Sequence, residues 1–264
     1  MVKVYTIASG KGGTDKTTVS VNIGTTLAQL GKKTYIMDAD IGMANVGLVL
    51  GLQDAPVTLH EVLAGKGNIN DAIYEGPCGL NVIPSGISLQ GFQQADPDRI
   101  RDVMGELVDR CEYLIIDAPA GISKDGVVPL AVADEVILVV NPELSSIVDA
   151  LKTKILTEVV GGHVLGSIIN RVDQEKTDAI TKKMEKVIGV KVIGIIPEDA
   201  NVRRASSAKT PIVLKFPTSP AAKAIRRIAS DLAGVPCVEE KTATTKEGFI
   251  DRLSKALFRK KPAE

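Results

Sequence analysis

The chain has few aromatic residues, few cysteines and no long apolar segment. Aromatic residues make up 3% of its 264 residues and tryptophan is absent, so the core must be aliphatic. Three widely spaced cysteines favour a reducing cytosol and argue against disulfides, a zinc site or an iron–sulfur carrier. No apolar run approaches the roughly 20 residues of a membrane span, and without a charged-then-apolar leader we expect no secretion signal. The two histidines, His60 and His163, are isolated, and we expect them at the surface or in packing.

Neither sign of charge is in excess, since 32 basic residues balance 32 acidic ones. The balance does not hold locally. Residues 246–261 hold six basic and two acidic residues, a net charge of +4, which leaves −4 for the rest of the chain. A mildly acidic body argues against general DNA binding, and we expect no sequence-specific nucleic-acid partner.

Aliphatic strand-like runs alternate with helical patterns along the chain. The runs are near-continuous, which is typical of parallel strands covered on both faces. We predict strands at 2–8, 33–37, 80–83, 113–116, 135–140, 164–169 and 191–195, and helices at 17–30, 98–110, 146–160, 177–188 and 220–233. This order predicts an α/β fold with a single doubly wound, mostly parallel sheet flanked by helices, and ligands at the carboxyl ends of the strands.

Composition divides the chain into a body, a linker and a tail. Residues 1–234 carry the alternating pattern, whereas residues 235–246 mix proline, glutamate, lysine and threonine with few large apolar residues. Residues 247–264 form one last helical pattern. We therefore expect one domain, a linker and a C-terminal amphipathic helix.

The most informative segment is 9–18, Ser-Gly-Lys-Gly-Gly-Thr-Asp-Lys-Thr-Thr, between a predicted strand and a predicted helix. Its spacing fits the P-loop pattern G-x-x-x-x-G-K-[ST], except that Asp15 replaces the second glycine. In such a loop the backbone N–H groups bind phosphate, Lys16 reaches the β- and γ-phosphates and the Thr17 hydroxyl binds Mg²⁺. The alternative is a glycine-rich turn with a chance lysine, which would not explain why strand, loop, lysine and threonine follow in this order.

Asp15 is expected to weaken this site. A side chain there crowds the path of the phosphates. Its carboxylate adds a like charge at about 4 Å, a repulsion of about 4 kcal/mol per unit charge pair at an effective dielectric near 20. Mg²⁺ and Lys16 offset part of this repulsion, so we expect a loss of ATP affinity of about 100-fold or more.

A second lysine, Lys11, makes the segment resemble the deviant Walker A motif of the MinD/ParA family of P-loop ATPases, and within it the archaeal MinD-like proteins. The resemblance extends over residues 1–235. It implies ATP and Mg²⁺ as cofactors and a homodimer that forms on ATP, in which Lys11 crosses to the partner's phosphates. Lys11, Lys16 and Asp40 are then the catalytic residues. The implied nucleotide contacts in the loop are Gly10, Lys11, Gly12, Gly13, Thr14, Lys16, Thr17 and Thr18.

Three aspartates follow predicted strands. Asp117 ends the aliphatic run 114–117, a Walker B pattern, and is expected to act with Thr17 at the metal, as an indirect Mg²⁺ ligand. Asp38 and Asp40 end the second strand, where a surface turn explains them equally well in isolation. By resemblance, Asp40 lies in switch I and orients the attacking water, while Asp38 is a polar support and a candidate indirect metal ligand.

Polar residues after two later strands are candidates for a base pocket. By resemblance, Asn170 contacts adenine and Arg171 flanks it, and an amide suits an adenine edge because it offers both a donor and an acceptor. Pro197, Glu198 and Asp199 fall at the corresponding place after the next strand. Loop polarity explains such short runs about as well.

Residues 141–149 resemble the family's segment at the dimer edge that receives partner proteins. The implied contacts are Asn141, Glu143, Ser145 and Asp149. A helix start capped by Ser145 or Ser146 explains the same residues, and both interpretations can hold together.

The tail has one apolar and one basic face on a helical wheel. The apolar stripe holds Phe249, Ile250, Leu253 and Leu257, and the basic face holds Arg252, Lys255 and Arg259. At about 15 residues the helix is too short to cross a bilayer and suits an anionic membrane interface. By resemblance it is a membrane-targeting sequence, which implies a cytoplasmic protein held peripherally on the inner face of the cell membrane. A terminal helix docked on the body is the alternative.

Together these patterns predict an ATPase that dimerises on ATP, binds the membrane reversibly through its tail and positions partner proteins, at the cell division site or elsewhere. A MinC- or MinE-like protein or another regulator is the expected partner. A ParA-like DNA or cargo partitioning ATPase would instead need basic patches on the body and no amphipathic tail. A nucleotide-impaired interaction scaffold is the other alternative, if Asp15 disables the loop.

Overall fold

The computed structural model describes residues 2–121, 124–173 and 177–237. Within these ranges one eight-stranded sheet has the order β3-β4-β2-β5-β1-β6-β7-β8. All neighbouring strands are parallel except β3 and β4, which are antiparallel. The strands are β1 (Lys3–Ser9), β2 (Thr34–Asp38), β3 (Tyr74–Glu75), β4 (Asn81–Ile83), β5 (Tyr113–Ala120), β6 (Glu135–Val140), β7 (Val164–Val172) and β8 (Val192–Pro197).

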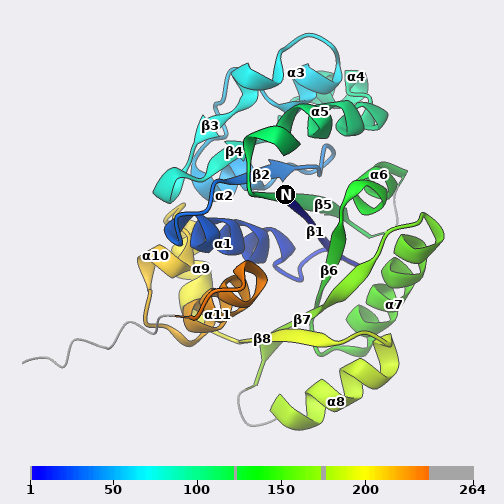
Figure 1. Ribbon diagram of the computed structural model, residues 1–264, viewed down its shortest axis with the longest axis vertical. Coiled ribbons are helices and arrows are strands. Elements are labelled where there is room, and N and C mark those ends of the chain that lie inside the picture. Colours follow the sequence, from blue (N-terminus) through cyan, green and yellow to red (C-terminus); the bar gives the residue numbers. More distant parts are fainter. Residues whose placement is uncertain (1, 122–123, 174–176, 238–264) are drawn as a thin grey trace, which may run out of the picture.

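Helices cover both faces of this sheet (Figure 1). One face is packed by α1 (Lys16–Gln29), α2 (Val46–Leu50), α9 (Ala200–Ser207), α10 (Ile212–Lys215) and α11 (Pro220–Ala233). The other face is packed by α3 (Leu59–Leu63), α5 (Ile100–Leu107), α6 (Lys124–Val132), α7 (Leu144–Val159) and α8 (Thr177–Ile188). The short α4 (Leu89–Gln94) lies against α3. The fold is therefore a three-layer, doubly wound α/β domain, which confirms the predicted class.

The core is aliphatic and lies on both faces of the sheet, because successive residues of each strand point to opposite faces. In β1, Tyr5 and Ile7 face α1 and α11, while Val4 and Ala8 belong to the clusters on the opposite face. Successive side chains on a strand point to opposite faces, so a central strand with both faces covered must be apolar throughout. This is why the uninterrupted apolar runs predicted the central strands.

Helix ends follow local capping chemistry. At α11 the Ser219 hydroxyl accepts the backbone N–H of Ala222, proline occupies the first turn, and Gly234 ends the helix with φ +68°. At α3 a capping box joins Thr58 and Glu61, with the Glu61 carboxylate accepting the Thr58 N–H at 2.8 Å. Such caps satisfy N–H groups that a helix leaves unpaired. They fix α3 beside the carboxyl end of β4, where the Leu59 N–H donates to the Pro84 carbonyl at 2.9 Å.

Every predicted strand and long helix is present, and the structure adds several short elements. The added strands and α-helices with no counterpart in the sequence expectations are β3, α2, α3, α4, α6, α9 and α10. None of the helices in the described ranges combines the length and apolar character needed to cross a membrane. The predicted tail 247–264 and the linker beyond residue 237 lie outside the described residues, so the division into body, linker and tail stays a prediction.

Candidate functional site

The predicted phosphate loop connects β1 to α1 at the centre of the sheet. Gly10 touches α7 so closely that a β-carbon would lie 2.2 Å from the Asp149 carbonyl carbon, which excludes any side chain there. Gly13 and Asp15 both have left-handed backbone angles, with φ +77° and +62°. That region favours glycine, and Asp and Asn tolerate it better than most residues. The loop therefore has the turn geometry of a P-loop even though residue 15 is not glycine.

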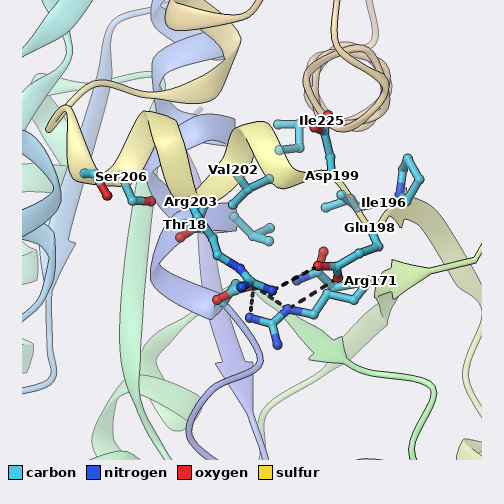
Figure 2. A pocket seen from close by; sticks show the side chains of 14 residues that line it. Thr18, Arg171, Ile196, Glu198, Asp199, Val202, Arg203, Ser206 and Ile225 are labelled. Carbon is cyan, nitrogen blue, oxygen red and sulfur yellow. Dashed lines mark hydrogen bonds and ion pairs between the residues drawn. The ribbon is translucent and has the colours of Figure 1, made fainter.

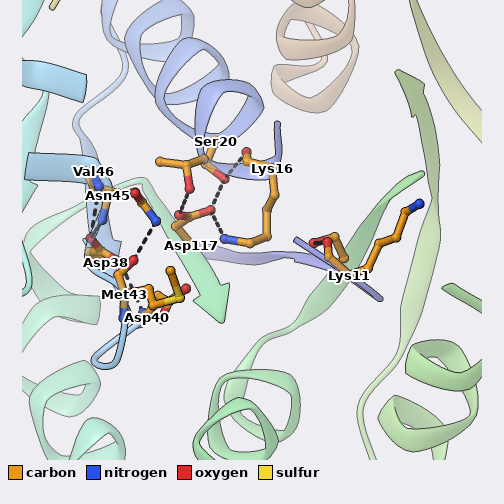
Figure 3. Close-up of polar contacts among 11 residues, drawn as sticks. Lys11, Lys16, Ser20, Asp38, Asp40, Met43, Asn45, Val46 and Asp117 are labelled. Atoms are coloured by element: carbon orange, nitrogen blue, oxygen red, sulfur yellow. Dashed lines mark hydrogen bonds and ion pairs between the residues drawn. The ribbon is translucent and has the colours of Figure 1, made fainter. Parts of the chain in front are cut away.

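Lys16, Thr17 and Asp117 converge at the start of α1 (Figure 3). The Lys16 Nζ lies 2.9 Å from one carboxylate oxygen of Asp117, and the Thr17 hydroxyl donates to the other at 2.6 Å. Ser20, one turn further along α1, also donates to this carboxylate, at 2.7 Å. Lys16 and Asp117 are buried, with 6% and 0% of their side chains exposed. The structure thus brings together the residues predicted for phosphate and for metal.

These groups have the chemistry that a Mg-nucleotide requires. Mg²⁺ prefers hard oxygen ligands with phosphate oxygens completing its shell, and Thr17 and Asp117 offer a hydroxyl and a carboxylate. The Thr14 hydroxyl, in the loop itself, is buried and has no hydrogen-bond partner among the described residues. Buried hydroxyls are rarely left unpaired, so this one fits a phosphate oxygen. The donor set therefore fits both the metal and the phosphates.

Asp38 and Asp40 hold the loop that follows β2. The Asp38 carboxylate accepts backbone N–H groups from Asp40, Asn45 and Val46 at 3.0–3.2 Å (Figure 3). Burial, followed by repulsion from the Asp117 carboxylate, raises the pKa of Asp38 above its ordinary range. Asp38 thus anchors this loop, and its contacts match the predicted polar support, while its candidate role near the metal stays a prediction.

Asp40 lies in the same loop, and its carboxylate accepts fewer backbone hydrogen bonds than that of Asp38. One oxygen accepts the Met43 N–H at 2.9 Å. Burial is the main cause that raises the pKa of Asp40, and Lys16 and the Met43 N–H oppose it. A half-buried carboxylate beside the Lys16–Asp117 cluster can accept a hydrogen bond from water, which is the role predicted for Asp40.

Lys11 is paired within its own chain. Its Nζ lies 2.8 Å from a Glu143 carboxylate oxygen and 2.9 Å from the Ser145 hydroxyl. A hydrogen bond from Lys11, with its charge, lowers the pKa of Glu143. The residue predicted to cross a dimer interface is therefore held by two of the residues predicted to contact partners.

The other two residues predicted as partner contacts differ from each other. Asn141 is 3% exposed and its backbone N–H donates to the Ser146 hydroxyl at 3.0 Å, so its side chain is not available at the surface. Asp149 is partly exposed and forms an ion pair with Lys152 at 3.1 Å. Asn141 is therefore buried just after β6, and its part in a partner contact stays a prediction. Glu143, Ser145 and Asp149 remain candidates.

The predicted base residues line one cavity of about 310 Å³ beside α1 (Figure 2). Asn170 is buried and donates to the Thr14 carbonyl at 2.8 Å, which links this cavity to the phosphate loop. Apolar walls come from α1, β8, α9 and α11. The lining residues are Asp15, Thr18, Val19, Asn170, Arg171, Ile196, Pro197, Glu198, Asp199, Val202, Arg203, Ser206, Ser207 and Ile225. An apolar pocket with polar edges suits a nucleobase and its sugar.

Asp15 turns toward this cavity. Its carboxylate pairs with the Arg171 guanidinium at 2.6 and 2.7 Å. Weaker contacts extend the chain of charges, since Glu198 lies 3.8 Å from Arg171 and 3.6 Å from Arg203 (Figure 2). The sequence predicted a negative charge beside the phosphates, offset in part by Mg²⁺ and Lys16; the structure adds Arg171 as a further counter-charge, and the effect of Asp15 on ATP binding stays a prediction. The left-handed backbone directs the side chain to the base pocket, where an arginine neutralises it.

Sequence reasoning missed Ser20 and Arg203. Ser20 lies three residues after Thr17, and helical spacing could have placed both hydroxyls beside the same carboxylate. No sequence pattern marked Arg203 as a site residue, because it lies on a short helix that was not predicted. His60 was expected at the surface or in packing and is buried, with its Nε2 2.8 Å from the Ile41 carbonyl oxygen.

Comparisons with known proteins agree with this geometry. Residues 5–212 match the family described as the CobQ/CobB/MinD/ParA nucleotide binding domain. The chain is 49% identical to an uncharacterized ATP-binding protein of Methanocaldococcus jannaschii, over 98% of this chain and 97% of the relative. Among solved structures, the Pyrococcus furiosus cell division ATPase MinD superimposes with a TM-score of 0.83 at 36% identity, over 89% of this chain and 99% of the other. MinD of Pyrococcus horikoshii, solved with Mg-ADP, gives 0.82 at 34% identity, over 88% and 96%.

Proposed function

We propose, because the chain belongs to the CobQ/CobB/MinD/ParA family of nucleotide-binding domains, that it is an ATPase that dimerises on ATP and then binds an anionic membrane through its tail. ATP and Mg²⁺ are its cofactors, and hydrolysis would return the protein to the cytoplasm. While on the inner face of the cell membrane it would position a partner, such as a MinC- or MinE-like regulator, at the division site or elsewhere.

The observation that carries this proposal is the continuity between the Lys16–Asp117 cluster and the 310 Å³ cavity. The Asn170–Thr14 hydrogen bond joins the two, and both lie along α1. A nucleoside triphosphate needs such an arrangement, with an anion and metal site at one end and an apolar pocket with polar edges at the other. A general anion site would not need the pocket.

Each residue then has a defined part in the reaction. Bound Mg²⁺ would neutralise charge on the phosphates. Lys16 would bind the transferred phosphate, Thr17 and Asp117 would hold the metal site, and Asp40 would orient the attacking water. Lys11 would leave Glu143 and reach the phosphates of the second protomer.

Lys11→Ala is expected to prevent ATP-driven dimerisation while a monomer still binds nucleotide. The reason is that Lys11 is paired with Glu143 and Ser145, whereas Lys16 is the lysine paired with Asp117. Light scattering coupled to size exclusion, with and without Mg-ATP, measures the dimer. The same measurement is made on Lys11→Ala/Asp15→Gly, so that weak nucleotide binding cannot conceal the effect.

Glu143→Gln is the matched control for Lys11→Ala. It removes the same ion pair but keeps the lysine, so dimerisation should persist or increase slightly, since exposed ion pairs are weak. If Lys11→Ala dimerised normally with ATP, the assignment of this lysine to the second protomer would be wrong. If Glu143→Gln also lost the dimer, the ion pair itself would be the requirement.

The membrane part of the proposal rests on the tail sequence. Three basic residues, Arg252, Lys255 and Arg259, share a face, and each contributes about 1 kcal/mol near an anionic surface. The apolar stripe opposite adds the burial of large side chains such as Leu253. One tail of this size binds reversibly, and two tails joined in a dimer bind more tightly because the second encounter is intramolecular. Dimerisation would thus control membrane residence.

Removal of residues 247–264 is expected to abolish sedimentation with anionic vesicles without unfolding the body. Leu253→Glu should have nearly the same effect, because it places a charge within the apolar stripe. Phe258→Glu is the matched control. It makes the same change in charge, but on a helical wheel residue 258 lies away from the stripe, so binding should fall much less. Unchanged sedimentation of the truncated protein, with circular dichroism confirming its fold, would overturn the membrane proposal.

A nucleotide-impaired scaffold is the second candidate, and one observation favours it. The Asp15–Arg171 ion pair lies at the edge of the base cavity and places a carboxylate where family loops have glycine. Calorimetry with Mg-ATP separates the two functions. Absence of ATP binding at millimolar concentration, together with intact folding, would favour the scaffold.

A further inference from the structure

We propose that His60 is a positioning residue for Asp40, and that it acts through the carbonyl of Ile41, the residue that follows this aspartate. The proposal rests on the proposed ATPase function, in which Asp40 orients the attacking water. His60 lies on α3 and lines a cavity together with residues 41–45, and it is not among the residues that line the base cavity.

The hydrogen bond of His60 has a defined direction. Its Nε2 lies 2.8 Å from the Ile41 carbonyl oxygen, and a carbonyl can only accept, so Nε2 carries the proton. The imidazole is 1% exposed, and Nδ1 has no hydrogen-bond partner in the described part of the chain. Buried polar groups are hydrogen-bonded, and this imidazole has one such contact. That contact is the carbonyl of the residue next to Asp40.

The support behind His60 is rigid. The capping box of Thr58 and Glu61 fixes the start of α3, and the Leu59 N–H is bonded to the Pro84 carbonyl. Gly86 and Gly91 pack against the ring, where a β-carbon at residue 91 would come within 2.9 Å of Nδ1. The imidazole therefore cannot tilt away from Ile41 without displacing its neighbours.

The loop itself needs such a tether on its outer side. Asp38 holds the loop from beneath by accepting the N–H groups of residues 40, 45 and 46. Outside, a cavity of about 440 Å³ lies between the loop and α4, and Met43 is 75% exposed. Within the described part of the chain, the His60 side chain holds the Ile41 carbonyl by a hydrogen bond. This hydrogen bond holds the backbone next to Asp40 and thereby orients the Asp40 side chain.

The test separates hydrogen bonding from packing by comparing two replacements. His60→Gln keeps an N–H donor near the position of Nε2, whereas His60→Phe keeps a ring and removes the donor. His60→Phe should lower kcat for ATP about tenfold with KM changed less than twofold, because the hydrogen bond positions a group that acts in the transition state. His60→Gln should recover most of this loss.

A second pair of variants guards against a folding defect. Gly91→Ala pushes a β-carbon against the imidazole, while Gly105→Ala, also within a helix, meets nothing within 4 Å. Both gain the same helix propensity. Gly91→Ala should therefore lower kcat as His60→Phe does, and Gly105→Ala should match the unaltered chain.

Hydrogen–deuterium exchange supplies a readout independent of catalysis. His60→Phe and Gly91→Ala should speed exchange in the peptide covering residues 41–46, whose N–H groups at residues 43, 45 and 46 are bonded in the loop. Unaltered exchange and kcat in His60→Phe would overturn the proposal, as would a His60→Gln variant as impaired as His60→Phe. If the unaltered chain hydrolysed no ATP, the proposed function would fail, but exchange would still decide whether His60 holds the loop.

Discussion

Lys16→Ala is expected to lower ATP hydrolysis by about 1,000-fold or more. Removal of a single preorganised donor to a developing charge costs about 100- to 1,000-fold, and Lys16 supplies a full charge from a buried position. Its Nζ is buried 2.9 Å from Asp117 at the start of α1, so it is held in place before any ligand arrives. The measurement is steady-state phosphate release with saturating Mg-ATP.

The control for Lys16→Ala must account for stability. Without Lys16 the buried Asp117 carboxylate loses its counter-charge, and breaking a buried pair in this way costs about 3–5 kcal/mol of unfolding free energy. Lys16→Ala/Asp117→Asn removes both charges and should regain much of the lost Tm, while remaining inactive. A stable Lys16→Ala protein that hydrolysed ATP at the original rate would show that the phosphate assignment is wrong.

The central fold could be predicted because its signals are local and uninterrupted. Ile7, Ile115 and Ile137 lie on strands that are buried on both faces, so each strand reads as an apolar run. The short helices could not be predicted in this way. α2 and α3 have five residues each, too few for a helical period, and α6 contains Pro129. Tertiary packing stabilises these segments, and it leaves no pattern within one segment of sequence.

The candidate site was predictable to a similar extent. Lys16, Thr17 and Asp117 are brought together as expected, because the ends of parallel strands meet at one edge of a sheet and a loop of fixed length leads from β1 to α1. The direction of the Asp15 side chain was not predictable. It depends on a left-handed backbone angle and on Arg171, 156 residues away. Pairing between residues so far apart in the sequence leaves no local pattern from which it could be predicted.

Asp15→Gly is expected to raise ATP affinity by about 10- to 100-fold. The effect of the Asp15 charge on ATP affinity is reduced by a neighbouring positive charge. Its carboxylate carries a negative charge near the path of the phosphates, but Arg171 lies 2.6 Å away and neutralises much of it. The repulsion is therefore smaller than for an unpaired carboxylate, and each 1.4 kcal/mol that remains corresponds to about tenfold in affinity.

The backbone contributes to the same result. Residue 15 has φ +62°, and a non-glycine residue in the left-handed region costs about 1–2 kcal/mol, less for aspartate than for most side chains. Glycine removes this cost and lets the loop tighten around a phosphate. It also releases Arg171 from the carboxylate, so that the guanidinium can flank a base in the cavity. The tighter loop and the released Arg171 favour the nucleotide, whereas the backbone cost is already present without nucleotide and its removal favours folding.

Three variants measured by calorimetry with Mg-ATP separate these contributions. Asp15→Asn removes the charge and keeps a side chain that tolerates the left-handed region, so it should gain part of the affinity that Asp15→Gly gains. Arg171→Ala should weaken ATP binding more when Asp15 is present than in the Asp15→Gly protein, because only the former then has an unpaired carboxylate at the pocket. Equal effects of Arg171→Ala in both proteins would show that the ion pair has no influence on the nucleotide. A micromolar ATP affinity with Asp15 in place, unchanged on Asp15→Gly, would show that the loop accommodates the carboxylate once Arg171 holds it.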